Sequence, residues 1–587
     1  IHLSIVSWAS FSVITVNIKI KIAEIFGYIR FLYFVFSMIL TIKSYLYRKK
    51  EEQFSFLKLG VGILILLVCG LRLIRNFNNI VDISFDDEVK YLRYGLDLFD
   101  SIKNDWGPTY NIWYKFLSFF EQRPIELYLL NYKVVILLTA ISFYLFLYTY
   151  GFSFAVSLWV SFCLLISNTN IVTYPRISHV IVSFFLICLV INKLFIKSKA
   201  KQYILICFAL FTGAFARPEL MLSFLIFSVF TGYTIWKKHP IKEWIFFSLP
   251  FFGVLVFLLL VFNLPANTYM GKDRLYGVFC QHYTVKYIYT HKADYALFID
   301  WIAFSKEQFP GCETFTDIVK KYPIVVIQGM LTNIKIFVLV ILGGIADILY
   351  PKYLYYKKAL ELLSFIVVFV LLSLGLFSKD RRAAIWNELK EKKELFFILL
   401  VFALPGFASS VVFFPRPHYL LFLMIPIIVY LSVFLDIVFS GKKIKEYIIL
   451  ILALIFMIKT PDIKTYKTPH IISGTCPNQS YKQFIRTLNQ ASDKPHVIFS
   501  NILNLSMMTD KNFTDFGAED KYTNDKPFTT HVQEQQIDHI LVTEFLLQDR
   551  RLKKDSTWLQ LIATPEAFGF RKKMLFKDCP TYLLYKE

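Results

Sequence analysis

Long apolar segments recur along this chain of 587 residues, and they constrain its fold more than any other feature. A run of about 18 or more apolar residues is long enough to cross a bilayer as a helix. Hydrophobic residues make up 56% of the chain, more than a soluble globular protein of this size needs. We therefore predict a polytopic α-helical membrane protein with about 11 to 13 spans. The apolar segments lie at about 1–19, 27–47, 56–75, 131–150, 152–170, 179–197, 202–217, 219–236, 244–263, 359–378, 395–413, 419–439 and 446–460.

The formal charge of +21 would suit a nucleic-acid-binding protein, but its distribution indicates a membrane protein. Basic residues gather in short loops between apolar segments, as the positive-inside rule requires. With these spans, all the basic loops fall on one side, which we assign to the cytoplasm. The remaining loops then face the periplasm of a bacterial inner membrane, and no nucleic-acid partner is expected. The five basic clusters are 43–50, 192–201, 236–242, 378–393 and 440–447.

One apolar segment, 318–349, is left out of the predicted spans. Its first part carries Lys320, Lys321 and Lys335 together with a proline, so we expect a helix lying along the outer membrane surface. Three outer regions follow from this topology.

The first outer loop comprises 76–130 and the second comprises 264–358, both within a membrane module at 1–460. The third region, 461–587, contains the strand-like runs "HVIFS", "HILVTEFLL" and "TYLLYK" between polar stretches. We predict that it forms a small extracytoplasmic α/β domain.

Four of the cysteines lie in the predicted outer regions. Cys280 and Cys312 belong to the second loop, and Cys476 and Cys579 belong to the tail. An oxidising compartment permits disulfides between them, and pairing within each region is the simplest of the three arrangements. No CxxC motif or His/Cys cluster in the sequence indicates a structural metal.

Three consecutive acids, Asp86, Asp87 and Glu88, follow the apolar segment 56–75. They have a structural explanation, because Ser84 precedes them as a capping residue and acids favour the positive end of a helix. Apolar residues then recur at three- and four-residue spacing, which predicts an amphipathic helix. This apolar stripe comprises Val89, Leu92, Leu96 and Phe99.

The same acids also have a functional interpretation. A carboxylate at the start of an interfacial helix is partly shielded from water, so its pKa can be tuned for general-base catalysis. Tyr91 and Tyr94 share a helical face with Asp87. We rank Asp87 first as the base, Asp86 second and Glu88 last.

The stretch "DDEVKYLRYGLDL", followed by "WGPTYNIWYKFL", resembles the first outer loop of the GT-C glycosyltransferases. That superfamily includes protein O-mannosyltransferases, lipid A aminoarabinose transferases and bacterial arabinofuranosyltransferases. The resemblance implies a catalytic acid in this loop and a polyprenyl-phosphate-linked sugar donor. It also implies an inverting or retaining transfer of the sugar to an extracytoplasmic glycan, lipid or protein. The architectural likeness covers most of the chain, whereas the residue-level likeness is confined to this loop and a few short motifs.

Three further motifs place arginines in tight outer turns. They are "AFARPELM" with Arg217, "TYPRISH" with Arg176 and "FFPRPHYL" with Arg416. Each arginine has a structural explanation as an interfacial side chain or a turn-stabilising ion pair. However, an arginine fork also binds phosphate oxygens in a bidentate manner, as a lipid-phosphate donor requires. Lys272 and Arg274 are second-rank candidates for this phosphate site.

Several side chains around these motifs are expected to line the substrate site. Bound Mg²⁺ or Mn²⁺ is compatible with the acids but is not required by them. Two rival functions stay open: a transporter or lipid flippase, and a non-catalytic envelope assembly protein. The expected lining residues are Tyr91, Tyr94, Arg93, Trp106, Tyr110, Glu219, His179, His418 and Tyr419.

Overall fold

The computed structural model divides the chain into two compact units, Ile1–Gly60 and Val61–Glu587. The helix that begins at Phe56 crosses the boundary between these units, and the other described elements belong to the second unit. The predicted spans 1–19, 27–47 and 359–378, and nearly all of 446–460, lie outside the described residues. The structure describes residues 56–83, 87–98, 107–171, 175–238, 244–264, 268–269, 272–293, 296–299, 301–349, 378–439, 460, 481–490, 493–502, 505–518, 521–522, 525–575 and 581–586.

The structure is mostly helical (74%), and seven of its described helices are long and apolar enough to cross a membrane. This number and their composition indicate membrane association. Six of them coincide with predicted spans. The seven are α2 (Phe56–Leu73), α6 (Pro124–Thr149), α9 (Ile177–Phe195), α12 (Ile245–Phe262), α17 (Pro323–Leu349), α20 (Lys393–Val412) and α21 (Pro417–Phe439). Three further predicted spans also form helices: α7 (Phe154–Leu165) and α10 (Lys199–Ala214), which are shorter, and α11 (Leu220–Lys238), whose apolar stretch is limited to Leu220–Ile235.

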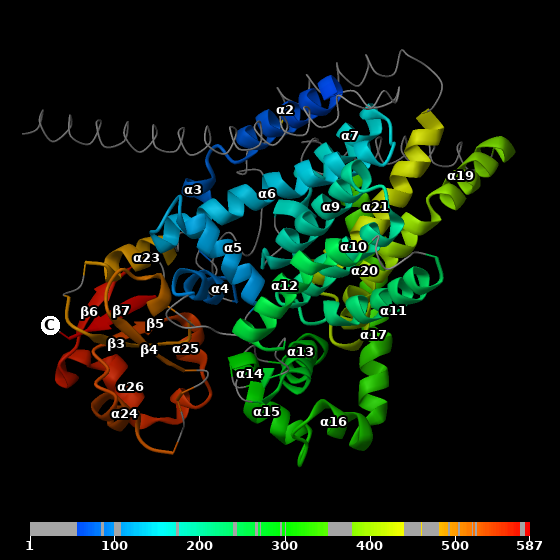
Figure 1. The fold of residues 1–587 in the computed structure, drawn as a ribbon. Coiled ribbons are helices and arrows are strands. Elements are labelled where there is room, and N and C mark those ends of the chain that lie inside the picture. Colours follow the sequence, from blue (N-terminus) through cyan, green and yellow to red (C-terminus); the bar gives the residue numbers. More distant parts are fainter. Residues whose placement is uncertain are drawn as a thin grey trace, which may run out of the picture. The chain divides into compact units, whose positions relative to one another are not determined.

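The long helices pack in pairs. Helix α6 lies against α9, and α20 lies against α21 (Figure 1). The rings of Phe185 on α9 and Phe402 on α20 stack with centroids 3.9 Å apart. Gly406 allows α20 to approach α21 closely, because a Cβ there would lie 2.7 Å from the carbonyl oxygen of Tyr419. The first turn of α21 therefore packs closely against α20.

The predicted basic loops 192–201 and 378–393 lie at the same end of the helices. Lys199 forms an ion pair with Glu394 at 2.7 Å, which joins the start of α10 to the start of α20. Lys392 donates a hydrogen bond to the carbonyl oxygen of Tyr150, just after α6. This shared end agrees with the charge pattern, whereas clusters 43–50 and 440–447 lie outside the described residues.

Helix α17 corrects the prediction for 318–349. That segment was expected to be one helix on the membrane surface, but α16 (Phe315–Lys321) ends at the lysine pair and α17 starts afresh at Pro323. Proline is well tolerated at the first position of a helix, so it begins α17 rather than interrupting it. Helix α17 has 27 residues, of which Lys335 and Asp347 are the charged ones, and it contacts both α20 and α21. It therefore joins the helices of membrane-spanning length.

Shorter elements fill the two predicted outer loops. Within the described residues, the first contains α3, α4 and α5, and the second contains a two-stranded sheet, the helices α13 to α16 and the long helix α17. A short helix, α8, follows α7, and α19 precedes α20. Their bounds are α3 (Phe77–Ile80), α4 (Asp87–Leu96), α5 (Pro108–Ser118), α8 (Asn168–Ile171), β1 (Thr268–Tyr269), β2 (Lys272–Asp273), α13 (Arg274–His291), α14 (Ala296–Ile299), α15 (Trp301–Gln308) and α19 (Lys379–Glu391), with α16 and α17 as given above.

The predicted bridge between Cys280 and Cys312 is not formed in the structure, which keeps both residues as thiols. Both are buried in one cluster with Phe279, Trp301 and Phe309. A thiol packs in such surroundings as a small apolar side chain, so burial alone accounts for both cysteines. Cys476 and Cys579 lie outside the described residues.

The tail contains a five-stranded sheet in the order β4-β3-β5-β7-β6, drawn in orange to red in Figure 1. Strand β3 is parallel to β4 and β5, whereas β7 is antiparallel to β5 and β6. The predicted runs correspond to β3, β5 and β7, but β4 and β6 were not predicted. The strands are β3 (His496–Ser500), β4 (Phe513–Gly517), β5 (His539–Val542), β6 (Arg571–Met574) and β7 (Tyr582–Tyr585); the helices are α23 (Tyr481–Leu488), η4 (Ser506–Met508), α24 (Phe528–Glu534), α25 (Glu544–Gln548), η5 (Leu552–Lys554), α26 (Ser556–Ala563) and η6 (Pro565–Phe568).

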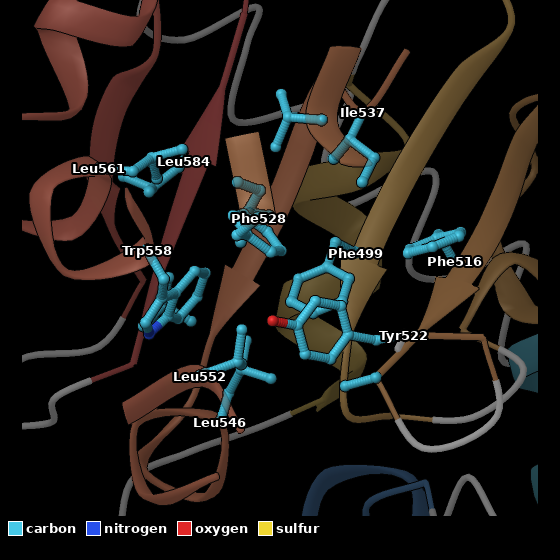
Figure 2. Packing of buried hydrophobic residues seen from close by; sticks show 14 of the residues in the cluster. Phe499, Phe516, Tyr522, Phe528, Ile537, Leu546, Leu552, Trp558, Leu561 and Leu584 are labelled. Carbon is cyan, nitrogen blue, oxygen red and sulfur yellow. The ribbon is translucent and has the colours of Figure 1, made fainter. Parts of the chain in front are cut away.

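Helices α24 and α26 enclose an aromatic core against this sheet. Figure 2 shows Phe499 of β3 beside Phe528, and Phe528 beside Trp558. Ring centroids are 4.9 Å apart in the first pair and 4.8 Å apart in the second. All three side chains are at most 1% exposed. This burial gives the tail an apolar core made from its own residues.

Candidate functional site

The second acid of α4, Glu88, is buried at the centre of a hydrogen-bond network between α4, α5 and α6. Tyr110 and Tyr114 lie one turn apart on α5, and each hydroxyl donates to Glu88 Oε1 at 2.5 Å. Asn131 Nδ2 donates to the same oxygen at 2.9 Å, and the backbone N–H of Arg176 donates to Oε2 at 2.9 Å. Four donors thus converge on one carboxyl group.

This network removes Glu88 from the candidate bases. The side chain is 1% exposed, so a substrate has no access to its oxygens. Burial raises the pKa of Glu88, and the hydrogen bonds from Tyr110 and Tyr114 oppose that rise. A buried carboxyl group with four donors instead fixes the position of α4 against the α8–α9 turn.

The first acid of α4, Asp87, faces a different environment. It is half-buried, and Tyr91 follows it one helical turn later with 4% of its surface exposed. Burial raises the pKa of Tyr91 most, and the Asp87 charge adds to that rise. The positive charges of Arg217 and Arg274 oppose it. The charges of Asp87, Arg217 and Arg274 thus all influence the Tyr91 phenol.

Arg217, in the turn between α10 and α11, is the better candidate of the two arginines for binding an anionic ligand. Its guanidinium lies over the ring of Tyr419 at 4.7 Å, and its Nε is 3.0 Å from Glu219 Oε1. That contact is close enough for an ion pair but is not aligned as a hydrogen bond. Arg217 is 5% exposed, and within the described residues its Nε and Nη2 have no hydrogen-bond acceptor.

The charge of Arg217 is nevertheless well supported. Burial lowers the pKa of its guanidinium, but Glu219 raises it, and Tyr419, Tyr91 and Asp87 raise it further. The net direction is upward, so Arg217 stays protonated. A buried cation with donors still available is suited to an anionic ligand.

Arg176 does not fit the predicted phosphate site. Its side chain is fully buried, Nη1 donates to the Asn170 carbonyl oxygen, and Nη2 donates to that of Ile171 at 3.3 Å. The guanidinium also lies 3.8 Å from the ring centre of Tyr132. His179 belongs to the same turn and contacts the Thr169 carbonyl oxygen through Nε2 at 3.0 Å. Arg176 and His179 thus hold the turn before α9 and are not exposed to a ligand.

The third arginine turn contacts the second outer loop. Arg416 Nη2 donates to Gln281 Oε1 of α13 at 3.4 Å. Burial lowers the pKa of His282, and the charge of Arg416 lowers it further. His418 is buried in this turn, and the next residue, Tyr419, has its ring under the guanidinium of Arg217. The Arg217 and Arg416 turns are therefore neighbours.

The remaining predicted residues are dispersed. Arg93 forms an ion pair with Asp97 at 2.6 Å, Tyr94 is half-buried on α4, and Tyr110 belongs to the Glu88 network. Lys272 begins β2, and Arg274 begins α13. Asp86 and Trp106 lie outside the described residues.

A polar depression of about 510 Å³ lies at the far end of α4. Its nearest lining residue on α4, Arg93, is six residues from Asp87, about 9 Å along the helix at 1.5 Å per residue, and neither Asp87 nor Arg217 lines it. Its charged lining comes from α4, α5 and a tail loop. The lining side chains include Arg93, Asp97, Lys115, Asp510 and Lys511.

Two functional partners were not predicted from the sequence. Asn131 donates to Glu88, and Gln281 accepts from Arg416. Asn131 had a usable signal, because a polar residue at the start of an otherwise apolar segment usually has a buried partner. Gln281 lies in a mixed polar and aromatic helix, where nothing in the local sequence distinguishes it.

Comparison of the chain with protein-family models, with curated proteins and with solved structures finds no match in any of the three. The resemblance to GT-C enzymes therefore stays a prediction from the first-loop motifs. The site geometry must support any functional assignment by itself.

Proposed function

We propose that this chain is an integral-membrane glycosyltransferase that uses a polyprenyl-phosphate-linked sugar. The observation that carries the proposal is Arg217, a buried, protonated guanidinium with Nη2 available beside Asp87 and Tyr91. In this proposal the seven long apolar helices span the inner membrane, and the basic loops face the cytoplasm. Asp87, Arg217 and Arg416 then face the periplasm.

The reaction needs a base and a phosphate-binding cation on the same side. An acceptor hydroxyl or amine attacks the anomeric carbon, and the bond between that carbon and the phosphate oxygen breaks. Asp87 takes the acceptor proton, and the lipid phosphate leaves with its electron pair and charge. Arg217 stabilises that charge, with Arg274 and Arg416 as further cations around the site.

Binding of the lipid phosphate tests the first half of the proposal. The wild-type protein in nanodiscs should bind radiolabelled polyprenyl phosphate but not the corresponding polyprenol, which has no charge for Arg217 to hold. R217M should weaken this binding by about 10- to 100-fold, the worth of one or two charge-assisted hydrogen bonds. R123Q is the matched control, because Arg123 is exposed and pairs with Glu121. Equal binding by wild type and R217M would overturn the phosphate role.

Transfer assays test the second half. D87N should retain lipid-phosphate binding and lose about 10²- to 10⁴-fold in sugar transfer from a panel of polyprenyl-phosphate sugars. D97N is the control, because Asp97 directly follows the same helix and pairs with Arg93. Full transfer by D87N would exclude Asp87 as the base. Binding without transfer in the wild type, accompanied by lipid movement across proteoliposomes, would favour a flippase instead.

A further inference from the structure

A cluster of two histidines and one aspartate lies at one edge of the tail sheet. His496 is the first residue of β3, and Asp538 directly precedes His539, the first residue of β5. Strands β3 and β5 are parallel neighbours, and Ile498 is paired with His539. Because parallel strands start at the same edge, the three side chains meet there. One potential ligand atom from each lies within 4.8 Å of the others.

The two histidines both contact the Asp538 carboxylate. The Asp538 carboxylate accepts from His496 Nδ1 at 2.5 Å and from His539 Nδ1 at 2.9 Å, using one oxygen for each. The backbone N–H of Val497 donates to Asp538 Oδ1 at 2.9 Å and fixes the orientation of the carboxylate. Both imidazoles therefore present the same nitrogen to the same carboxylate.

The surroundings hold the cluster in place. His496 is 8% exposed and His539 is 4% exposed. The ring of Phe513 on β4 lies 5.1 Å from each imidazole, and the two imidazoles are 4.7 Å apart. Asp538 is more accessible, so an ion and a water molecule have a path to the carboxylate. Three potential ligands on two strands are thus preorganised with one open side.

We propose that His496, Asp538 and His539 bind a divalent transition-metal ion, with Zn²⁺ the best fit. Two imidazole nitrogens and one carboxylate oxygen form a donor set that zinc favours, and water completes a tetrahedron. The ion binds the Nδ1 lone pair of each neutral imidazole, and each ring then carries its proton on Nε2. It links the first residues of β3 and β5, so it stabilises the tail sheet. This site is independent of the transfer chemistry at Asp87.

The test is zinc binding by the purified full-length chain in detergent. After treatment with a chelator, the wild type is equilibrated with ZnCl₂ alone, and bound metal is measured by elemental analysis. We expect about one zinc per chain at this site and a zinc-dependent rise in the thermal midpoint. H496Q, H539Q and D538N should each bind zinc at least ~100-fold more weakly, because each removes a direct ligand. H291Q removes an exposed histidine of α13 and should bind as the wild type does.

Cobalt provides a readout that does not depend on the variants folding. Co²⁺ bound to the wild type by nitrogen and oxygen ligands gives visible bands without the strong thiolate absorption that cysteine ligands would add. Such bands, displaced by Zn²⁺, support the site. Absence of bound zinc in the folded wild type, a thiolate spectrum, or unchanged zinc binding in folded D538N would each overturn the proposal. In that case the three side chains form only a hydrogen-bond network.

Discussion

Arg176 and Arg217 occupy similar turns and are similarly buried, yet their hydrogen bonding differs. Each guanidinium lies over a tyrosine ring, at 3.8 Å from Tyr132 and at 4.7 Å from Tyr419. Both terminal nitrogens of Arg176 donate to carbonyl oxygens, whereas Nη2 of Arg217 has no acceptor among the described residues. Desolvating a cation is costly unless its donors are used. Arg176 therefore has a sufficient structural role, and Arg217 is the one of the pair that a ligand would complete.

The adjacent acids repeat this contrast. Glu88 accepts four hydrogen bonds, one of them from the backbone of Arg176, whereas Asp87 lies beside Tyr91 near Arg217. One helical turn thus supplies a structural carboxyl group and a candidate base. These two environments should differ in their effects on stability and on ligand binding.

The largest expected effect is on stability at Arg176. R176M should lower the free energy of unfolding by about 1 to 3 kcal/mol for each carbonyl left without its donor. R217M should lower it by less than R176M does, because it breaks one ion pair with Glu219 rather than two hydrogen bonds to buried carbonyl oxygens. Thermal unfolding in the same detergent compares the two. Equal losses in both variants would remove the distinction between the turns.

Activity should show the opposite order. R217M that folds as the wild type does should reduce sugar transfer by about 10²- to 10³-fold. This is the usual effect of removing one hydrogen-bond donor from a negative charge that develops in the transition state. R217K should recover part of this, since it keeps the charge but not the planar fork. The measurement is the transfer rate at saturating donor. A stable R217M with normal transfer would assign Arg217 a structural role as well.

Glu88 and Asp87 give a comparison that depends on pH. E88Q should lower the free energy of unfolding by about 1 to 3 kcal/mol. The glutamine replaces one acceptor oxygen by an NH₂ group, which cannot accept a hydrogen bond from the donor that faces it, either the N–H of Arg176 or the donors on the other side. Burial raises the folded-state pKa of Glu88 above its ordinary 4.5. The stability contributed by the protonated carboxyl is therefore complete below pH 4.5 and declines as pH rises through the folded pKa.

The stability difference between wild type and E88Q should accordingly shrink as pH rises from 4.5. Chemical unfolding across this pH range measures it, with D87N as the control that leaves the network intact. A difference that grows with pH would mean that Glu88 is bound as the anion, with a depressed pKa.

The smallest expected effect concerns Asp82, which is buried as Glu88 is. Its carboxylate accepts from the backbone N–H groups of Tyr481 and Lys482 at 2.6 and 3.0 Å, which caps α23 of the tail. D82N should cost about 1 kcal/mol, the usual worth of an N-cap, because the amide keeps one of two acceptors. Amide hydrogen exchange in α23 should rise in D82N and stay unchanged in D493N, whose carboxylate is exposed. Unchanged exchange in D82N would show that the cap is dispensable.

Local patterns in the sequence were sufficient for most helices and for three strands. Apolar length predicted six of the seven long helices, because a span is a local property of composition. It left out 318–349, where three lysines and a proline predicted a surface helix, although Pro323 starts an apolar helix of 27 residues. The strands β4 and β6 were missed because the exposed pattern of Arg571–Met574 and the mixed pattern of Phe513–Gly517 have no continuous apolar run.

The sequence by itself determined which residues are chemically capable: a triplet of acids at a helix start and arginines in three tight turns. It could not rank them, since rank depends on partners far away in the chain. Glu88 is fixed by Tyr110, Asn131 and Arg176, up to 88 positions distant. Only the tertiary structure decided that both terminal nitrogens of Arg176 have acceptors whereas Nη2 of Arg217 has none among the described residues, because hydrogen-bond satisfaction and burial are set by packing between helices. The same holds for His496 and Asp538, 42 positions apart, which the parallel pairing of β3 and β5 brings to one sheet edge.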